Sequence, residues 1–419
     1  MTFEAACAVF RSRNRRRFDD AAEAVITSAK RGLSESDVVI LCESLAASGQ
    51  NVRLPNSLAP FVDVPSSGGP ASLTTLLCPL LVATFGFYVP KLSATGSVAG
   101  GIDTMGVIPG FNTKLSGSSF INALRKSRFA HAEPTKTFCP ADKNLVEKRR
   151  ARNMMANPQL ATASLLAKKL ATPNTCAVFD FRVGVAGNIG NTFAAARRTK
   201  QLFLSVADKL DLHVEVVLTE GRVFPSSALG RLESLFLLWQ ILSNGNLLRV
   251  DKDHLSLCIN ISAKACRLAN PEKLSFSKIT TQLQQLLRSG EVKRRFLLHL
   301  AAQGTTRRSF EELLKCRVNQ QVMSICCRGS GHWIPPDLNR AKEWVKCEQN
   351  RLGKGVARRK SIEAQIGLSL CRTPGAKVKR GDVVTQLRYP QRLVVANIPS
   401  WLGGTVAQLQ PRKSRSYLG

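Results

Sequence analysis

The pattern of apolar and polar positions predicts a mixed α/β protein. Two continuous apolar runs, CAVFDFRVGV at residues 176–185 and HVEVVLTE at 213–220, are typical of buried strands. Residues 73–89 contain Pro79 and Gly86 and fall short of the roughly 20 apolar residues that cross a bilayer, so they predict a buried helix leading into a core strand.

Helices are predicted where apolar residues recur at helical spacing. Residues 18–30 and 35–48 show this pattern. Residues 151–170 are rich in helix formers, with Pro158 placed where a helix begins. In TASLLAKKLA at 162–171, Ser164 and Lys168 are four residues apart and share one helix face. Taken alone, this segment is equally typical of an amphipathic helix with solvated lysines.

A Gly-rich turn is predicted in VDVPSSGG at residues 62–69. Such turns direct backbone N–H groups at phosphate, although SSGG alone is also typical of a flexible surface turn. In order and spacing, this turn, PADK at 140–143 and TASLLAKKLA resemble the thymidine and pyrimidine nucleoside phosphorylase family. The family's runs are V-D-K-H-S-T-G-G-V-G-D, P-A-D-K and T-A-S-I-L-A-K-K-L.

Further matches extend the resemblance over most of the chain. They are LSESDVVILCESLAASGQ at 33–50, VFDFRVGVAG at 178–187, LTEGRVFPSSALGRLES at 218–234 and IGLSLCRTPGAKVKRGDVV at 366–384. The resemblance implies an α/β, nucleoside phosphorylase-like fold. The expected parts are a basic arm or targeting segment at 1–17, a small helical domain at 18–58 and 137–172, a large mixed α/β domain at 59–136 and 173–312, and a C-terminal α+β domain with a basic tail at 313–419.

The resemblance also assigns a pocket residue by residue. It places the nucleobase on Arg149, Ser164 and Lys168, where an arginine and a lysine offer donors to base carbonyls. It places phosphate on Ser66, Gly68, Gly69, Thr75 and Ser93.

Departures from the family gather at the chemistry. The family's lysine is Val64, its histidine Pro65, its aspartate Ser72, its threonine Gly101, and its asparagine Arg231, beside the retained Gly230 and Glu233. The S-G-R-G-L loop is shorter at 93–96. Losing one fixed cation removes about 3 kcal/mol of electrostatic stabilisation. We therefore expect a relic pocket with no catalytic residue, no metal and no cofactor.

The charge balance indicates a polyanionic partner. The chain has 60 Lys and Arg against 29 Asp and Glu, a net charge of +31. Aromatic residues make up only 6%, which favours RNA backbone contacts over base stacking. Candidate RNA contacts are Arg13, Arg15, Arg16, Arg17, Arg197, Arg198, Lys293, Arg294, Arg295, Arg358, Arg359, Lys360, Lys377, Lys379, Arg380, Arg412, Lys413 and Arg415.

Two functions stay open. The preferred hypothesis is an inactive homologue that serves as a structural, RNA-contacting subunit of a large ribonucleoprotein, the mitochondrial ribosome, with ribosomal RNA and neighbouring subunits as partners and no membrane insertion. The alternative is an active pyrimidine nucleoside phosphorylase that cleaves thymidine or uridine with phosphate, with Lys91 replacing the lost lysine. The arginine-rich residues 1–17 fit mitochondrial residence, as a transit peptide or as an arm. The family dimerises through its helical domain, and whether this chain does so is left open.

Overall fold

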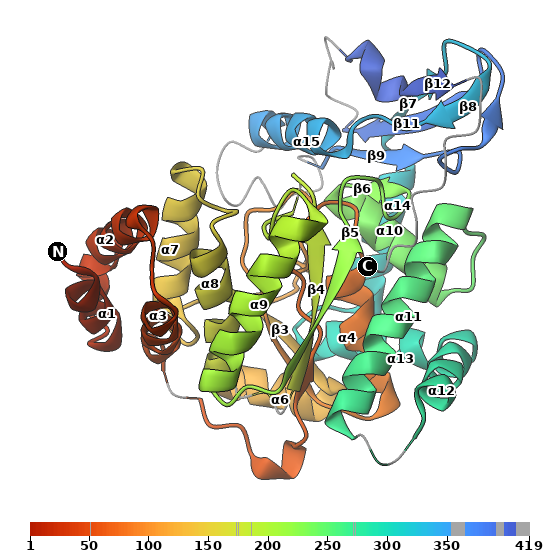
Figure 1. Cartoon of the computed structure of the whole chain (residues 1–419). Coiled ribbons are helices and arrows are strands. Elements are labelled where there is room, and N and C mark those ends of the chain that lie inside the picture. Colours follow the sequence, from red (N-terminus) through yellow and green to blue (C-terminus); the bar gives the residue numbers. More distant parts are fainter. Residues whose placement is uncertain are drawn as a thin grey trace.

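The computed structural model describes residues 1–419 except 51, 173, 175, 186, 271, 273, 353–364, 391–397 and 408–419. In Figure 1, a group of helices lies on the left, the α/β part lies in the centre, and the small C-terminal sheets lie at the upper right. The predicted mixed α/β fold is confirmed. Within the described residues, no helix combines the length and apolar character needed to cross a membrane.

The helical part combines two stretches of chain that are far apart in sequence. Its helices are α1 (Phe3–Arg11), α2 (Phe18–Arg31), α3 (Glu35–Ala47), α7 (Pro140–Ala151) and α8 (Pro158–Ala171), with a 3₁₀ turn at Arg15–Arg17. Asn157 caps α8 by accepting the N–H of Leu160, and Pro158 occupies the first turn, as predicted. The buried apolar faces of these helices share one core with β4 and α9, which fixes the helical part against the α/β part.

Residues 3–11 of the predicted basic arm or targeting segment at 1–17 are helical. They form α1, whose start is capped by the Thr2 hydroxyl, which accepts the N–H of Ala5. Phe3 and Phe10 are buried, and Phe10 meets Phe18 of α2 edge to face with ring centroids 5.6 Å apart. The apolar side of α1 therefore belongs to the core, and the arginines that follow lie on its surface.

The α/β part is built on two short parallel sheets. One has the order β1 (Val62–Asp63), β4 (Cys176–Val183), β5 (Val214–Glu220), and the other pairs β2 (Val89–Leu92) with β3 (Phe129–Ala132). Both predicted buried strands are present, and every residue of β4 is buried. The surrounding helices are α4 (Thr74–Phe85), α5 (Gly101–Met105), α6 (Gly117–Ser127), α9 (Phe193–Lys209), α10 (Arg231–Leu242), α11 (Arg249–Ala269), α12 (Phe276–Arg288), α13 (Glu291–Ala302) and α14 (Arg307–Val318), with a 3₁₀ turn at Asn56–Leu58.

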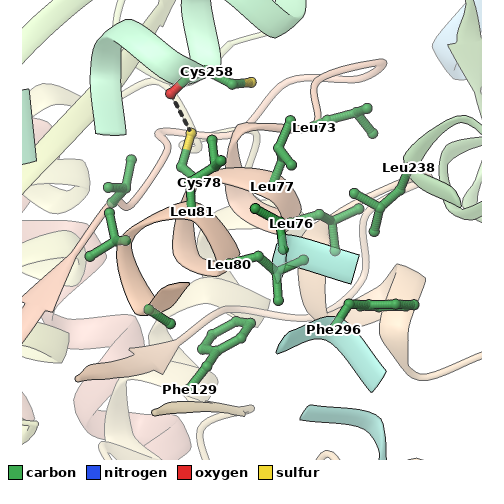
Figure 2. Packing of buried hydrophobic residues seen from close by; sticks show 14 of the residues in the cluster. Leu73, Leu76, Leu77, Cys78, Leu80, Leu81, Phe129, Leu238, Cys258 and Phe296 are labelled. Atoms are coloured by element: carbon green, nitrogen blue, oxygen red, sulfur yellow. Dashed lines mark hydrogen bonds between the residues drawn. The ribbon is translucent and has the colours of Figure 1, made fainter. Parts of the chain in front are cut away.

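Helix α4 lies in the middle of the largest hydrophobic core, and β2 follows it, as the sequence predicts. In Figure 2, Leu76, Leu77 and Leu80 point from one side of the helix, and Cys78 and Leu81 from the other, into neighbouring elements. Cys78 donates its thiol to the carbonyl oxygen of Cys258 in α11 at 3.4 Å. A helix that is apolar on all sides must be buried on all sides, and this burial anchors the Gly-rich turn that precedes α4.

The C-terminal part consists of two small antiparallel sheets and one long helix. The sheets have the orders β6 (Ala228–Leu229), β9 (Gly367–Leu370), β11 (Val383–Tyr389), β7 (Gln321–Cys326) and β10 (Lys377–Val378), β8 (Gly331–Ile334), β12 (Thr405–Ala407). The helix is α15 (Leu338–Leu352), and a 3₁₀ turn covers Ser400–Gly403. Strand β6 comes from the chain just before α10, so the α/β part contributes an edge strand to the C-terminal sheet. The domain boundaries stay a prediction.

Candidate functional site

One cavity of about 730 Å³ brings the two ends of the predicted pocket together. All of the residues assigned by resemblance line it: Ser66, Gly68, Gly69, Thr75, Ser93, Arg149, Ser164 and Lys168. The α/β part contributes the Gly-rich turn and the loop after β2, while α7 and α8 contribute the other wall. Residues separated by about a hundred positions therefore face one space, and their individual roles stay predictions.

The Gly-rich turn is fastened to β4. The Ser66 hydroxyl donates to Oδ2 of Asp180 at 3.1 Å, and the Ser67 N–H donates to the Asp180 carbonyl at 2.9 Å. Gly68 and Gly69 have φ angles of 101° and 123°, a region that favours glycine. The turn is therefore held by specific hydrogen bonds, and the surface-turn alternative is wrong.

The missing lysine leaves an apolar side chain that does not reach the cavity. Val64 is fully buried in the core around α4. Lys91, the sequence-based replacement, donates Nζ to Oδ1 of Asp63 at 2.9 Å and to the Val64 carbonyl at 2.7 Å. Lys169 binds the other oxygen of Asp63. Lys91 is therefore already engaged with a buried carboxylate, which argues against its role as the free phosphate cation.

Asp63 carries its charge in spite of complete burial. Burial raises the pKa of Asp63, but the ammonium groups of Lys169 and Lys91 outweigh it and hold the pKa below its usual range. Burial also lowers the pKa of Lys169, and Asp63 opposes that shift. One carboxylate thus serves two lysines, and when all three are charged this wall of the cavity keeps a surplus positive charge.

The nucleobase end is made by α7 and α8. Lys168 Nζ lies 2.5 Å from Oδ2 of the buried Asp142 and donates to the Ser164 hydroxyl at 3.0 Å. Arg149 donates Nη2 to the Met155 carbonyl at 2.6 Å, which fixes the guanidinium against the chain between the helices. Burial lowers the pKa of Arg149 to about 10, so it stays charged at neutral pH. The lysines of α8 are buried and paired, contrary to the solvated-lysine alternative.

The loop after β2 is held by charged groups from two sides. Asp103 accepts the N–H groups of Gly96 and Ser97, each at 2.9 Å, and Arg150 of α7 donates to the Thr95 carbonyl at 2.9 Å. A Cβ at Gly101 would lie 2.7 Å from Oγ1 of Thr75. The glycine that replaces the family's threonine is therefore required by the packing of Thr75 in this chain.

Two site residues were missed by the sequence analysis. His131 on β3 lies with Nε2 2.8 Å from the Ser93 hydroxyl, and burial lowers its pKa well below the usual value, so it is neutral. Arg182 on β4 is buried behind the turn, where a Cβ on Gly69 would lie 3.6 Å from its Nε. Its Nε and Nη2 have no hydrogen-bond partner within the described part of the chain. Both residues are recognised as part of the site only from contacts between segments that are far apart in sequence.

The predicted RNA contacts are scattered over several surfaces. Arg13, Arg16, Arg17, Arg197 and Arg198 are exposed. Arg15 donates to the Lys136 carbonyl, Lys293 covers the Trp239 ring, Arg294 pairs with Glu291, and Arg295 donates to the Ser127 carbonyl. Lys377, Lys379 and Arg380 are exposed in the C-terminal part. Arg358, Arg359, Lys360, Arg412, Lys413 and Arg415 lie outside the described residues.

Comparisons with known proteins support the resemblance. No family model matches the chain. The chain is 24% identical over 375 residues to a pyrimidine-nucleoside phosphorylase of Geobacillus stearothermophilus, covering 88% of this chain and 83% of the relative. It is 26% identical over 366 residues to a thymidine phosphorylase of Colwellia psychrerythraea, covering 85% and 81%. An anthranilate phosphoribosyltransferase of Thermus thermophilus shares the fold, with a TM-score of 0.51 at 15% identity over 75% of this chain and 96% of that one.

These relatives correct one expectation. Both curated homologues are named as phosphorylases, which points to an enzyme and overturns the prediction of an inactive protein without catalytic residues. The predicted departures from the family remain, and local packing explains the one at Gly101. The resemblance of this chain to the thymidine and pyrimidine nucleoside phosphorylase family is thereby confirmed over most of its length.

Proposed function

We propose that this protein is a pyrimidine nucleoside phosphorylase that cleaves thymidine or uridine with inorganic phosphate. The observation that carries the proposal is the single cavity in which Arg149 and Lys168 face the Gly-rich turn. Phosphorolysis needs donors on the base at one end and an anion site at the other, so that both reactants meet in one orientation. The names of the two curated relatives support this reaction class.

The reaction follows from the chemistry of the two ends. A phosphate oxygen attacks the anomeric carbon, the bond to the pyrimidine nitrogen breaks, and the electron pair leaves with the base. Arg149, buried and charged, stabilises the negative charge that develops on the base carbonyls, and Lys168 holds the adjoining wall through Asp142 and Ser164. The Gly69 N–H and the Ser93 hydroxyl bind phosphate oxygens, and neutral His131 orients Ser93. Ser66 donates to Asp180 and accepts the Gly68 N–H, and it thereby holds the turn in place.

Positive charge near the phosphate end survives the loss of the family's lysine. The pair of lysines on Asp63 leaves one surplus charge at the cavity wall. The guanidinium of Arg182 lies buried behind Gly69, and Asp180 and Glu220 are the carboxylates that act on it. These fixed charges need no reorganisation when phosphate arrives, which is the condition for electrostatic catalysis.

The test is phosphate-dependent release of thymine from thymidine, or of uracil from uridine, by the purified protein. We expect Arg149→Ala to lower kcat/KM about 100-fold, or ~2.7 kcal/mol, because one preorganised donor is lost. Arg149→Lys retains the positive charge but lacks the planar set of donors of a guanidinium, so its kcat/KM should lie between those of the wild type and Arg149→Ala. Arg152→Ala, at the exposed end of α7, is the control and should keep wild-type activity. A folded protein that releases no base from any pyrimidine nucleoside would refute the proposal.

We also propose RNA as a binding partner of the enzyme, because the net charge of +31 exceeds what a small-molecule reaction requires. Replacing the exposed Arg16 and Arg17 by glutamine should make the decline of log affinity for RNA with log salt concentration shallower by about 1.5, since each lost phosphate contact contributes about 0.7–0.9 to this slope. Filter binding measures the slope, and Lys209→Gln, which removes an exposed lysine paired with Glu35, is the matched control. Salt-independent binding would contradict the idea. Mitochondrial residence stays a prediction.

A further inference from the structure

Helix α15 turns one polar stripe toward the cavity. Leu338, Ala341 and Val345 are buried in the C-terminal core, so the position of the helix is fixed. Asn339, Lys342, Glu343 and Lys346 line the cavity, and their spacing of three, four and seven residues places them on one helix face. Figure 1 shows α15 between the C-terminal strands and the upper ends of α7 and α8. The C-terminal part therefore contributes a wall to the site.

The lysines of this stripe differ from the other cations that line the cavity in their partners within the protein and in the exposure of their side chains. Lys91, Lys168 and Lys169 each bind a buried carboxylate. Arg149 and Arg150 donate to backbone carbonyls of Met155 and Thr95. Lys342 and Lys346 share the single carboxylate of Glu343, at 2.9 and 3.4 Å, and their side chains remain 21% and 42% exposed. Of the described lining cations, these two are the most available to an incoming anion.

The charges on the stripe are complementary to a dianion. Burial raises the pKa of Glu343, but Lys342 and Lys346 outweigh it and lower the pKa, so the carboxylate is ionised and the stripe keeps a net positive charge. Asn339, three residues before Lys342 and seven before Lys346, adds a side-chain amide donor to the same face of the helix. Phosphoryl oxygens are the acceptors that such charged donors bind most strongly.

We propose that Lys342 and Lys346 of α15 form a phosphoryl-binding position in the cavity. The proposal rests on the proposed phosphorylase function and assigns an anion contact of the cavity to the C-terminal part. The phosphoryl group is that of inorganic phosphate or that of a 5′-phosphate on the nucleoside. Both present the same dianion to the stripe, and the experiment separates them.

The experiment compares the wild-type enzyme with the Lys342→Gln, Lys346→Gln double variant by calorimetric titration and by steady-state kinetics. Inorganic phosphate and thymidine 5′-monophosphate are titrated separately. If α15 holds the attacking phosphate, the loss of both ammonium groups raises the Kd and KM of inorganic phosphate at least tenfold, or about 1.4 kcal/mol, while the KM of thymidine is unchanged. If it holds a phosphate ester, only the monophosphate loses affinity. Either result supports the position.

Two further variants control for unspecific charge effects and for misfolding. Arg351→Gln removes a cation of the same helix that pairs with Glu348 and does not line the cavity, so it should leave phosphate affinity unchanged. Glu343→Gln frees both lysines and should tighten phosphate binding, an effect that misfolding does not imitate. Unchanged affinity for both anions in the double variant overturns the position. Lysine-dependent phosphate binding by an enzyme that cleaves no nucleoside keeps the position and refutes only the proposed function.

Discussion

Asp63→Asn is expected to lower the free energy of unfolding by about 3–5 kcal/mol, because removing one partner of a buried ion pair leaves an uncompensated charge. Asp63 is fully buried, and its two carboxylate oxygens bind Lys91 and Lys169 separately. Asparagine has nearly the same shape, so the loss comes from charge and hydrogen bonding. Both lysines line the cavity, and we expect their displacement to weaken phosphate binding as well. Urea denaturation followed by circular dichroism measures the change in stability.

The control for Asp63 is an aspartate whose ion pair is exposed. Asp19 lies 3.9 Å from Lys148 with its side chain 63% exposed, and Asp19→Asn should change stability by less than about 0.5 kcal/mol. A similar small effect for Asp63→Asn would contradict the account of the network. Since the pKa of Asp63 is depressed in the folded state, its contribution is complete above the ordinary aspartate value of about 3.9 and is lost as the pH falls toward the folded value. The acid side of the stability curve should therefore flatten in Asp63→Asn.

The main elements of the fold were predictable because their signals are local. An apolar run such as β4 is buried wherever it lies, and Asn157 followed by Pro158 begins a helix by its own chemistry. The order and spacing of weak motifs then assigned the lining residues to one pocket. That assignment required no geometry, since relatives of the same fold bring the same segments together.

The rest depended on contacts that no local pattern contains. The arginines after α1 mask its apolar face, and only the partners α2 and α3 show that this face is buried. Lys91 carries the charge that a phosphate site needs, yet its engagement by Asp63 is visible only once β1 and β2 lie side by side. The stripe of α15 at residues 339–346 follows the Gly-rich turn at 66–69 only after some two thirds of the chain, and nothing in the family's motifs points to it.

A buried carboxylate strengthens the joint between the α/β part and the C-terminal part, beside the pairing of β6 with β9. Glu233 at the start of α10 is 2% exposed and accepts from Nε of Arg317 in α14 at 3.1 Å and from Nη2 at 2.5 Å. The hydroxyl of Ser369 on β9 also donates to it, and Nε of Arg388 on β11 lies 3.7 Å away. Arg317 also lies over the Phe236 ring at 3.7 Å. One side chain therefore joins α10 and α14 to the sheet that carries α15.

Glu233→Gln is accordingly expected to cost about 3–5 kcal/mol, because Arg317 keeps its charge in a site that no longer neutralises it. Glu311→Gln, which breaks the exposed pair of Glu311 with Arg307 on α14, is the control and should cost less than about 0.5 kcal/mol. Adding Arg317→Met to Glu233→Gln should recover part of the loss, since the unpaired charge is then removed. Equal, additive losses in that double-mutant cycle would show that the two residues act independently. Because α15 rests on this sheet, Glu233→Gln should also raise the KM for phosphate while the KM for the nucleoside changes less.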